Sequence, residues 1–280
     1  MQGGREHGEH HGLQPEEQAP LVYDMRGMGY SPEDILLCVD ADAEVNVEMK
    51  AGVGVKGLSR LDAVKQALVL FVHSKLLMHS QHRFAVATLR NNAVWYRQEF
   101  TNDMEVIGQA VRGLASGGTF PRCDLSELFQ MAATEAHSSH AMDRTLRVLL
   151  IYCRSSVVPE VTLQMPERQQ LFTFDALYLH DKPTRDNCPQ RVYDVLVDAL
   201  ERVSEFEGYI FESSSGSARV LFRHICVLLS HPQQRCAQEE FDAPKDLAKM
   251  VAPVPRTSSS GGLPQLRKEG EDDGSVPRTF

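Results

Sequence analysis

ILLCVDADAE, residues 35–44, joins an unbroken apolar run to three acidic residues at alternate positions. A continuous apolar run of this length is typical of a strand that is buried on both faces of a parallel sheet. In open parallel sheets, ligands bind beyond the carboxyl ends of the strands. The acids Asp40, Asp42 and Glu44 follow directly at that end. The sequence therefore predicts a ligand crevice beside this strand.

The chain on either side of this strand alternates strands and helices. Two more apolar runs, VLLIYC (148–153) and FTFDALYL (172–179), predict further buried strands. The segments 84–89 and 93–100 predict a hairpin, and 208–212 predicts a short last strand. Between these strands, apolar residues recur at helical spacing and predict helices. We predict a doubly wound α/β fold with a mostly parallel six-stranded sheet, one antiparallel edge strand and helices on both faces.

Local signals set the expected limits of some helices. Asn102 with Glu105 is a capping signature and predicts the start of one helix, which we expect to end at Gly117-Gly118. Pro189 suits the first turn of a later helix, because proline lacks the N–H that the first turn leaves unused. A last helix is expected at about 217–230.

The composition changes near both ends of the chain. Residues 1–29 are polar and contain no apolar run, so we predict a disordered leader without a signal peptide. From residue 236 onward, proline, serine, glycine and charged residues predict a flexible tail. The folded domain is expected at residues 30–235. Hydrophobic residues make up 42% of the chain, which is enough for a sizeable core.

Charge and motifs argue against several classes of protein. A net charge of -9 disfavours binding to nucleic acid or to an anionic membrane. The sequence has neither the H-E-x-x-H of zinc proteases nor the G-x-S-x-G of α/β hydrolases. AGVGVKG (51–57) lacks the ending of a phosphate loop and is interpreted as a connector. The six cysteines include no C-x-x-C pair and predict free thiols. We therefore predict that the protein is not an enzyme and holds no cofactor.

The element order, with one antiparallel edge strand, resembles the von Willebrand factor A (VWA) domain. In that family three loops hold a divalent cation through oxygen ligands, namely an Asp-x-Ser-x-Ser, a Thr after a Gly-Gly turn, and an Asp after the fourth strand. The resemblance places Asp40 at the first position, and Asp42 and Glu44 at the two serines. Thr119 in SGGTF (116–120) matches the threonine, whereas Cys153 stands at the last Asp.

Two interpretations of these positions stay open. In one, the acids and Thr119 still hold a metal ion. In the other the site is degenerate and binds no metal, because a thiol at Cys153 is a poor ligand for Mg²⁺ and the adjacent Arg154 would repel a cation. Asp40 would then close the strand end, Thr119 would bond within its loop, and Arg154 would supply the positive charge. We predict the degenerate site.

A more specific resemblance covers about residues 30–240. The core is identified as a member of the MERIT-forty family, in its plant type; these are the VWA-like subunits of the BRISC deubiquitinase and of the related BRCA A complex. The match rests on a set of segments spread along the chain: ILLCVDADAE, RFAVATLRNNAVWY (83–96), SGGTF, RVLLIYCRS (147–155), FDALYLHD (174–181) and LLSHPQQRC (228–236).

This resemblance implies a non-catalytic scaffold subunit of a deubiquitinase complex that is specific for lysine-63-linked ubiquitin chains. The implied roles are complex integrity and the DNA-damage response, in the nucleus and the cytoplasm. The implied partners are a BRE-like scaffold subunit, a zinc metalloprotease and its Abraxas-like partner, without direct contact to nucleic acid or membrane. The alternative is a metal-dependent VWA binding module or ubiquitin receptor in the proteasome or the transcription machinery.

The chain beyond the last helix is the expected docking segment for the BRE-like subunit. It carries both charge signs and an aromatic residue, and such segments often fold on a partner. The residues expected to make this contact are His231, Pro232, Gln233, Gln234, Arg235 and Phe241. The alternative is a strap that packs on its own domain.

Overall fold

The computed structural model describes residues 30–49, 57–162, 171–214 and 216–240. The predicted leader (1–29), most of the predicted connector (51–56), Phe241 and the tail beyond it lie outside the described residues. None of the described helices is long and apolar enough to cross a membrane. Three of the six free cysteines, Cys38, Cys123 and Cys153, are buried.

One six-stranded sheet forms the centre of the domain, in the order β5-β4-β1-β6-β7-β8. The central strand β1 pairs in parallel with β4 on one side and with β6 on the other, and only β5 runs antiparallel, against β4. The strands are β1 (Glu33–Asp40), β4 (Arg83–Leu89), β5 (Ala93–Thr101), β6 (Thr145–Tyr152), β7 (Thr173–Leu179) and β8 (Ile210–Ser213). The VWA-like fold class predicted from the sequence is thus confirmed, and a small extra ribbon of β2 (Glu48–Met49) and β3 (Leu58–Ser59) precedes α1.

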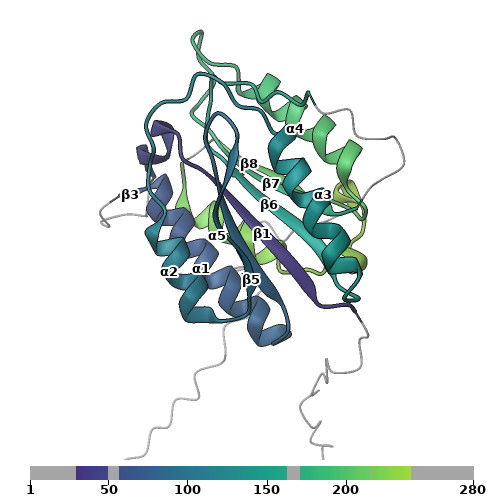
Figure 1. Ribbon diagram of the computed structural model, residues 1–280. Helices are drawn as coiled ribbons and strands as arrows, with labels where there is room; N and C mark the ends of the chain where they lie inside the picture. The colour runs from purple at the N-terminus through teal and green to yellow at the C-terminus, as the bar shows by residue number, and fades with distance from the viewer. Residues whose placement is uncertain (1–29, 50–56, 163–170, 215, 241–280) are drawn as a thin grey trace, which may run out of the picture. The chain divides into compact units, whose positions relative to one another are not determined.

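Helices cover both faces of the sheet, as Figure 1 shows. One face carries α1 (Arg60–Met78), α2 (Met104–Gly113) and α5 (Ala218–Val227), which pack on one another through α1. The other face carries α3 (Ser126–His140) and α4 (Pro189–Val203). The predicted proline start of α4 is confirmed, because Pro189 occupies its first turn.

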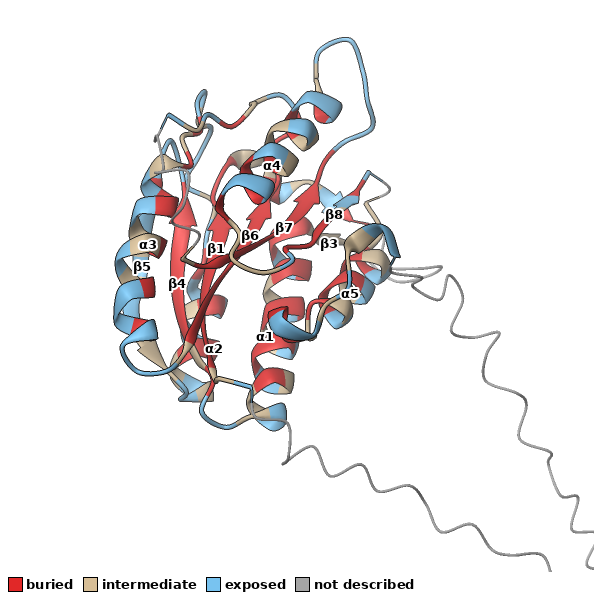
Figure 2. Cartoon of the chain, turned by 90° about the vertical axis from the view of Figure 1, so that its right-hand side faces the viewer, coloured by how far each residue is buried: buried red, intermediate tan, exposed pale blue. Residues whose placement is uncertain are grey.

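The core consists of two apolar layers, one on each face of the sheet. Side chains alternate along a strand, so Ile35, Leu37 and Val39 of β1 join the layer under α1, and Leu36 and Cys38 join the opposite layer. All eight residues of β1 are buried, which explains its unbroken apolar run, and Figure 2 shows the same burial along the central strands. This packing fixes the position of Asp40 at the end of β1.

The limits of α2 differ from those predicted. Asp103 caps the helix, with Oδ1 accepting hydrogen bonds from the backbone N–H groups of Glu105 and Val106. Asn102 instead donates from its side chain to the carbonyl of Ser80. A carboxylate is the stronger acceptor for a helix N-terminus, and the two neighbouring capping residues look alike in sequence. The helix also ends earlier, at Gly113, which frees the following loop to reach β1.

The described chain continues past the predicted domain boundary at residue 235. Two short 3₁₀ turns, η3 (Pro232–Gln234) and η4 (Gln238–Glu240), follow α5. The Tyr209 hydroxyl donates to the carbonyl of Cys236, and Gln238 bonds to the backbone of Ile210. Residues 231–240, called here the strap, therefore pack on the domain.

Candidate functional site

Three segments meet at the carboxyl end of β1, where the sequence predicted a ligand crevice. Ala41 and Asp42 of the first segment bond to the SGGTF loop: the N–H of Gly117 donates to the carbonyl of Ala41 at 2.7 Å, and the N–H of Phe120 donates to Oδ2 of Asp42 at 2.7 Å. Gly118, at φ +109°, forms a bridge with Asp42 in a conformation that favours glycine. The residues after β6 form the third segment.

Arg154, in the third segment, lies directly against Asp40. Its Nε and Nη2 atoms are 3.0 to 3.2 Å from the carboxylate oxygens of Asp40, and both side chains are fully buried. The guanidinium also donates to the carbonyls of Arg122 at 2.8 Å and Leu89 at 3.3 Å. The backbone N–H of Cys153 donates to Oδ2 of Asp40 at 3.1 Å. Asp40 thus has partners from its own chain at both oxygens.

The electrostatics of this pair follow from burial and contact. Burial raises the pKa of the Asp40 carboxyl, and the neighbouring charge of Arg154 opposes that shift. Burial alone would lower the pKa of Arg154, but Asp40 outweighs it and raises the pKa. The guanidinium is therefore a fixed positive charge at the strand end. Burial also raises the pKa of the Cys153 thiol, so the sulfur stays protonated and neutral.

Glu44 is held by a second set of donors. Its carboxylate accepts hydrogen bonds from the backbone N–H and the hydroxyl of Ser155, with oxygen distances of 3.0 and 2.7 Å. Arg60, the buried first residue of α1, lies 3.8 Å from the Glu44 carboxylate and donates to the carbonyl of Cys153. Its other nitrogen pairs with Asp181 after β7. Arg60 thus joins the ends of three strands with one positive charge.

The arrangement does not fit a divalent cation. Asp40 is paired with Arg154, Glu44 is held by Ser155 and lies near Arg60, and the Cys153 thiol is protonated. Thr119 is exposed, and its hydroxyl bonds to none of the described residues, contrary to the expected loop bond. Among the residues that the structure describes, no three His, Cys, Asp or Glu side chains gather as a metal-binding group. We call Asp40, Asp42, Glu44 and Arg154 the Asp40 cluster.

A second buried charge network lies at the opposite end of the strands. Glu33, at the start of β1, forms ion pairs with Lys75 of α1 and Arg147 of β6. Arg147 also donates to Asp175 of β7 at 2.6 Å. Arg235 of the strap closes the network, with Nη1 and Nη2 at 2.7 and 3.0 Å from the two oxygens of Asp175. The strap is therefore fixed to the sheet by a buried, two-pronged ion pair.

The predicted docking residues divide between the domain and the surface. His231 is buried, with its ring Nε2 3.0 Å from the carbonyl of Ser31. Pro232 is buried too, and the Arg235 side chain has no exposed surface. Gln233 and Gln234 are exposed. His231, Pro232 and Arg235 thus pack on their own domain, as the strap alternative expects. Docking stays a prediction for the two glutamines and for Phe241, which lies outside the described residues.

Curated proteins with similar sequences share one name. BRISC and BRCA1-A complex member 1 of Rattus norvegicus is 23% identical over 218 residues, which are 74% of this chain and 65% of that protein. The Xenopus tropicalis protein is 24% identical over 215 residues, covering 73% and 67%, and the Homo sapiens protein is 23% identical over 218 residues, covering 74% and 66%. The chain resembles BRISC and BRCA1-A complex member 1. It spans only 65% of the length of the rat protein, and no family model matches it.

Solved structures with a similar fold come from several kinds of protein. The PilB minor pilin from Streptococcus sanguinis has a TM-score of 0.48 at 10% identity, covering 72% of this chain and 61% of that one. The SpRpn10 VWA domain has a TM-score of 0.44 at 10% identity, covering 65% and 88%. The strand order and the single antiparallel edge strand described above define the fold of this chain.

Sequence reasoning missed two groups of residues around these sites. Arg60 and Ser155 hold Glu44, yet neither is a ligand position of the VWA motif, and Ser155 lies 111 positions from Glu44 in the chain. Lys75, Arg147 and Asp175 each lie within an apolar helix or strand. A charged residue in a fully buried element is itself a signal, because burying a charge requires a partner.

Proposed function

We propose that this chain is a non-catalytic scaffold subunit of a deubiquitinase assembly of the BRISC and BRCA1-A type, acting on lysine-63-linked ubiquitin chains in the nucleus and the cytoplasm. The similarity to BRISC and BRCA1-A complex member 1 over 74% of the chain is the observation that carries the proposal. The proposed partners are a BRE-like subunit, a zinc metalloprotease and an Abraxas-like subunit. A contribution to the DNA-damage response follows from membership of such an assembly.

The Asp40 cluster supports a binding role that does not use a metal ion. VWA domains with a complete cation site offer an open metal position to a partner's carboxylate. Here the charge opposite Asp40 is part of the chain and is buried, so this end of the sheet has a structural role. We place partner binding on other surfaces, including the exposed glutamines Gln233 and Gln234 of the strap.

Affinity purification of the tagged chain from its own cells, followed by mass spectrometry, tests this function. We expect recovery of a zinc metalloprotease together with a BRE-like subunit. The double variant Gln233→Ala/Gln234→Ala should recover less of the BRE-like subunit, whereas the matched surface variant Gln109→Ala on α2 should recover it in full. Recovery of proteasome or transcription-factor subunits in place of the metalloprotease would show that the proposal is wrong.

A further inference from the structure

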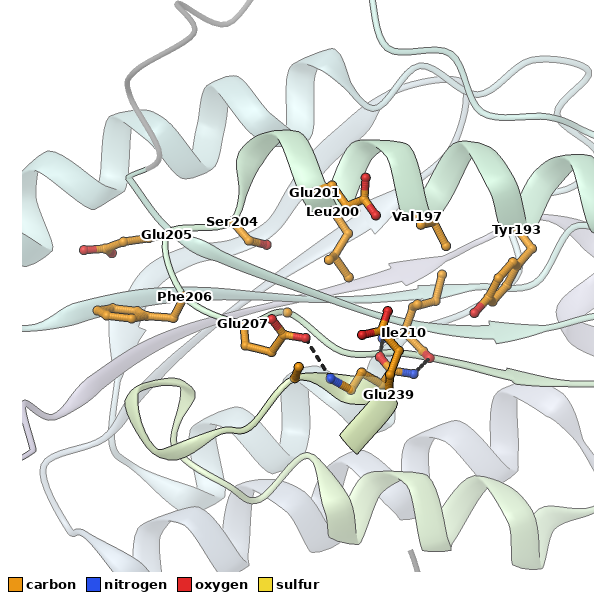
Figure 3. A pocket seen from close by; sticks show the side chains of 13 residues that line it. Tyr193, Val197, Leu200, Glu201, Ser204, Glu205, Phe206, Glu207, Ile210 and Glu239 are labelled. Carbon is orange, nitrogen blue, oxygen red and sulfur yellow. Dashed lines mark hydrogen bonds between the residues drawn. The ribbon is translucent and has the colours of Figure 1, made fainter. Parts of the chain in front are cut away.

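A groove lies beside the outer edge of the sheet, and neither the Asp40 cluster nor the buried ion pairs of Glu33 and Asp175 line it. It runs between α4, the loop before β8, and the strap, and has a volume of about 680 Å³ (Figure 3). This volume is within the range of sites that bind ligands or peptide side chains. We call it the α4–β8 groove.

The wall of the groove formed by α4 is largely apolar. Tyr193, Val197 and Leu200 lie at helical spacing and point from α4 toward the strap, as Figure 3 shows. Ile210, the first residue of β8, lines the opposite side. The groove therefore offers contact area for an apolar side chain.

The remaining wall is acidic. Four glutamates line the groove, and the described residues that line it include no lysine, arginine or histidine. Glu201 and Glu239 are exposed and form no ion pair with any described residue. At the end of the groove, Oε2 of Glu205 is buried and lies 3.7 Å from the ring Nε2 of His140, a residue of α3 that does not line the groove. Glu201 and Glu239 are therefore the carboxylates that an incoming cationic group would reach.

The strap holds the groove open in a defined shape. The backbone N–H of Gln238 donates to Oε1 of Glu207 at 2.9 Å. The side-chain amide of Gln238 both accepts from the N–H of Ile210 at 2.8 Å and donates to its carbonyl at 2.7 Å. These bonds fix the strap side of the groove on β8, so the groove is present before any partner arrives, which lowers the entropic cost of binding.

We propose that the α4–β8 groove binds a basic polypeptide segment of a partner protein, in which lysine or arginine alternates with apolar residues. The apolar side chains fill the space against Val197 and Leu200, and the cationic groups pair with the glutamates at the rim. Acidic side chains repel nucleic acid, and the apolar wall distinguishes a peptide from a simple cation. The proposal rests on this groove alone and holds whichever assembly the chain joins.

Fluorescence anisotropy with the full chain tests the proposal. The probe is a fluorescein-labelled heptapeptide in which lysine and leucine alternate. We expect saturable binding, and the double variant Glu201→Gln/Glu239→Gln should weaken it about tenfold, because two rim charges are lost. The matched control Glu127→Gln/Glu160→Gln removes the same charge from exposed sites outside the groove and should weaken binding less than about twofold.

Two further comparisons separate the groove from general attraction. A heptapeptide with serine in place of each leucine should bind about tenfold more weakly, because it cannot use the apolar wall. Val197→Trp fills the groove and should abolish binding, while thermal melting checks that each variant is folded. Equal weakening by both double variants, or equal affinity for the serine peptide, would overturn the proposal. Self-association of the chain that Glu201→Gln/Glu239→Gln abolishes would assign the groove to a second copy and would also overturn it.

Discussion

At the scale of single residues, Arg154 is the position that most shapes the carboxyl end of the sheet. The guanidinium of Arg154 is covalently part of the chain, so it lies opposite Asp40 in every folded molecule. The occupancy of a metal site, in contrast, depends on the free concentration of the ion. Arg154 also donates to backbone carbonyls of the neighbouring segments, so it joins loops as well as neutralising Asp40. Its loss would leave Asp40 buried and unpaired.

We expect Arg154→Ala to lower the free energy of unfolding by about 3–5 kcal/mol, the usual cost of breaking a buried ion pair at one partner. Urea denaturation measures this loss. The control Arg122→Ala removes an exposed arginine from the same region and should cost no more than about 0.5 kcal/mol.

Isothermal titration of the unaltered chain with Mg²⁺ and Mn²⁺ should give no saturable heat, because Arg154 already supplies the positive charge opposite Asp40. A saturable heat that disappears in Asp40→Ala would contradict the account of the Asp40 cluster.

At the scale of elements, the strap is a structural part of the domain, although its sequence is typical of a flexible tail. Arg235 reaches Asp175 across 60 positions of the chain and also lies 4.5 Å from the ring centre of Tyr209. Asp175 in turn accepts from the N–H of Tyr209, so β7, the loop before β8 and the strap share one carboxylate. The strap is therefore positioned by the centre of the sheet.

We expect Arg235→Ala to destabilise the domain by about 3 kcal/mol, since Asp175 keeps Arg147 as its remaining partner. Gln233→Ala changes an exposed side chain of the same strap and should lie within about 0.5 kcal/mol of the unaltered protein. Thermal and urea unfolding followed by circular dichroism measure both. Equal stability of the two variants would mean that the strap contributes nothing to the fold.

The sequence predicts regular elements better than it predicts long-range polar contacts. Apolar periodicity is local, so the ILLCVD strand, the hairpin partner of β4 and the proline start of α4 could be recognised from neighbouring residues. Asp103 rather than Asn102 caps α2. The two residues are adjacent and both can cap a helix, so the sequence pattern does not decide between them. Arg154 can be recognised because it follows a motif position. Asp175 can be recognised as a charge within a buried strand, but nothing local indicates that its partner is Arg235, 60 positions further along the chain.

At the scale of the whole domain, each end of the parallel strands has its own buried charges. Burial alone would raise the pKa of Glu33, but Lys75 and Arg147 outweigh it and lower the pKa to about 2. The same balance, set by Arg147 and Arg235, lowers the pKa of Asp175 to about 2. Burial, together with the charge of Lys75, lowers the pKa of His82 to about 3, and its neutral ring Nδ1 accepts from the N–H of Glu33.

We expect the domain to lose stability as the pH falls from about 6.5 toward 2. His82 has a lowered pKa in the folded state, so the unfolded chain takes up its proton first, below pH 6.5. Glu33 and Asp175 also have lowered pKa values, so their stabilisation is complete above about pH 4.5 and is lost as the pH falls to about 2. Glu33 alone contributes on the order of 3 kcal/mol.

Urea unfolding at a series of pH values measures this dependence. Glu33→Gln should be less stable than the unaltered protein at neutral pH and should show a shallower loss below about pH 4.5, since its carboxyl no longer titrates. An unfolding free energy that stays constant between pH 6.5 and 3 would contradict the assigned network.

The amide of Gln238 has a consequence for how the molecule behaves in a crowded solution. An outer strand offers unpaired backbone groups to other chains, and proteins with such strands tend to aggregate or to exchange segments unless the edge is protected. On β8, the side chain of Gln238 occupies the N–H and the carbonyl of Ile210 as a neighbouring strand would. On β5, the other outer strand, irregular register against β4 interrupts the edge. The strap thus occupies the outer backbone groups at the start of β8, so another chain cannot pair with that end of the strand while Gln238 is in place.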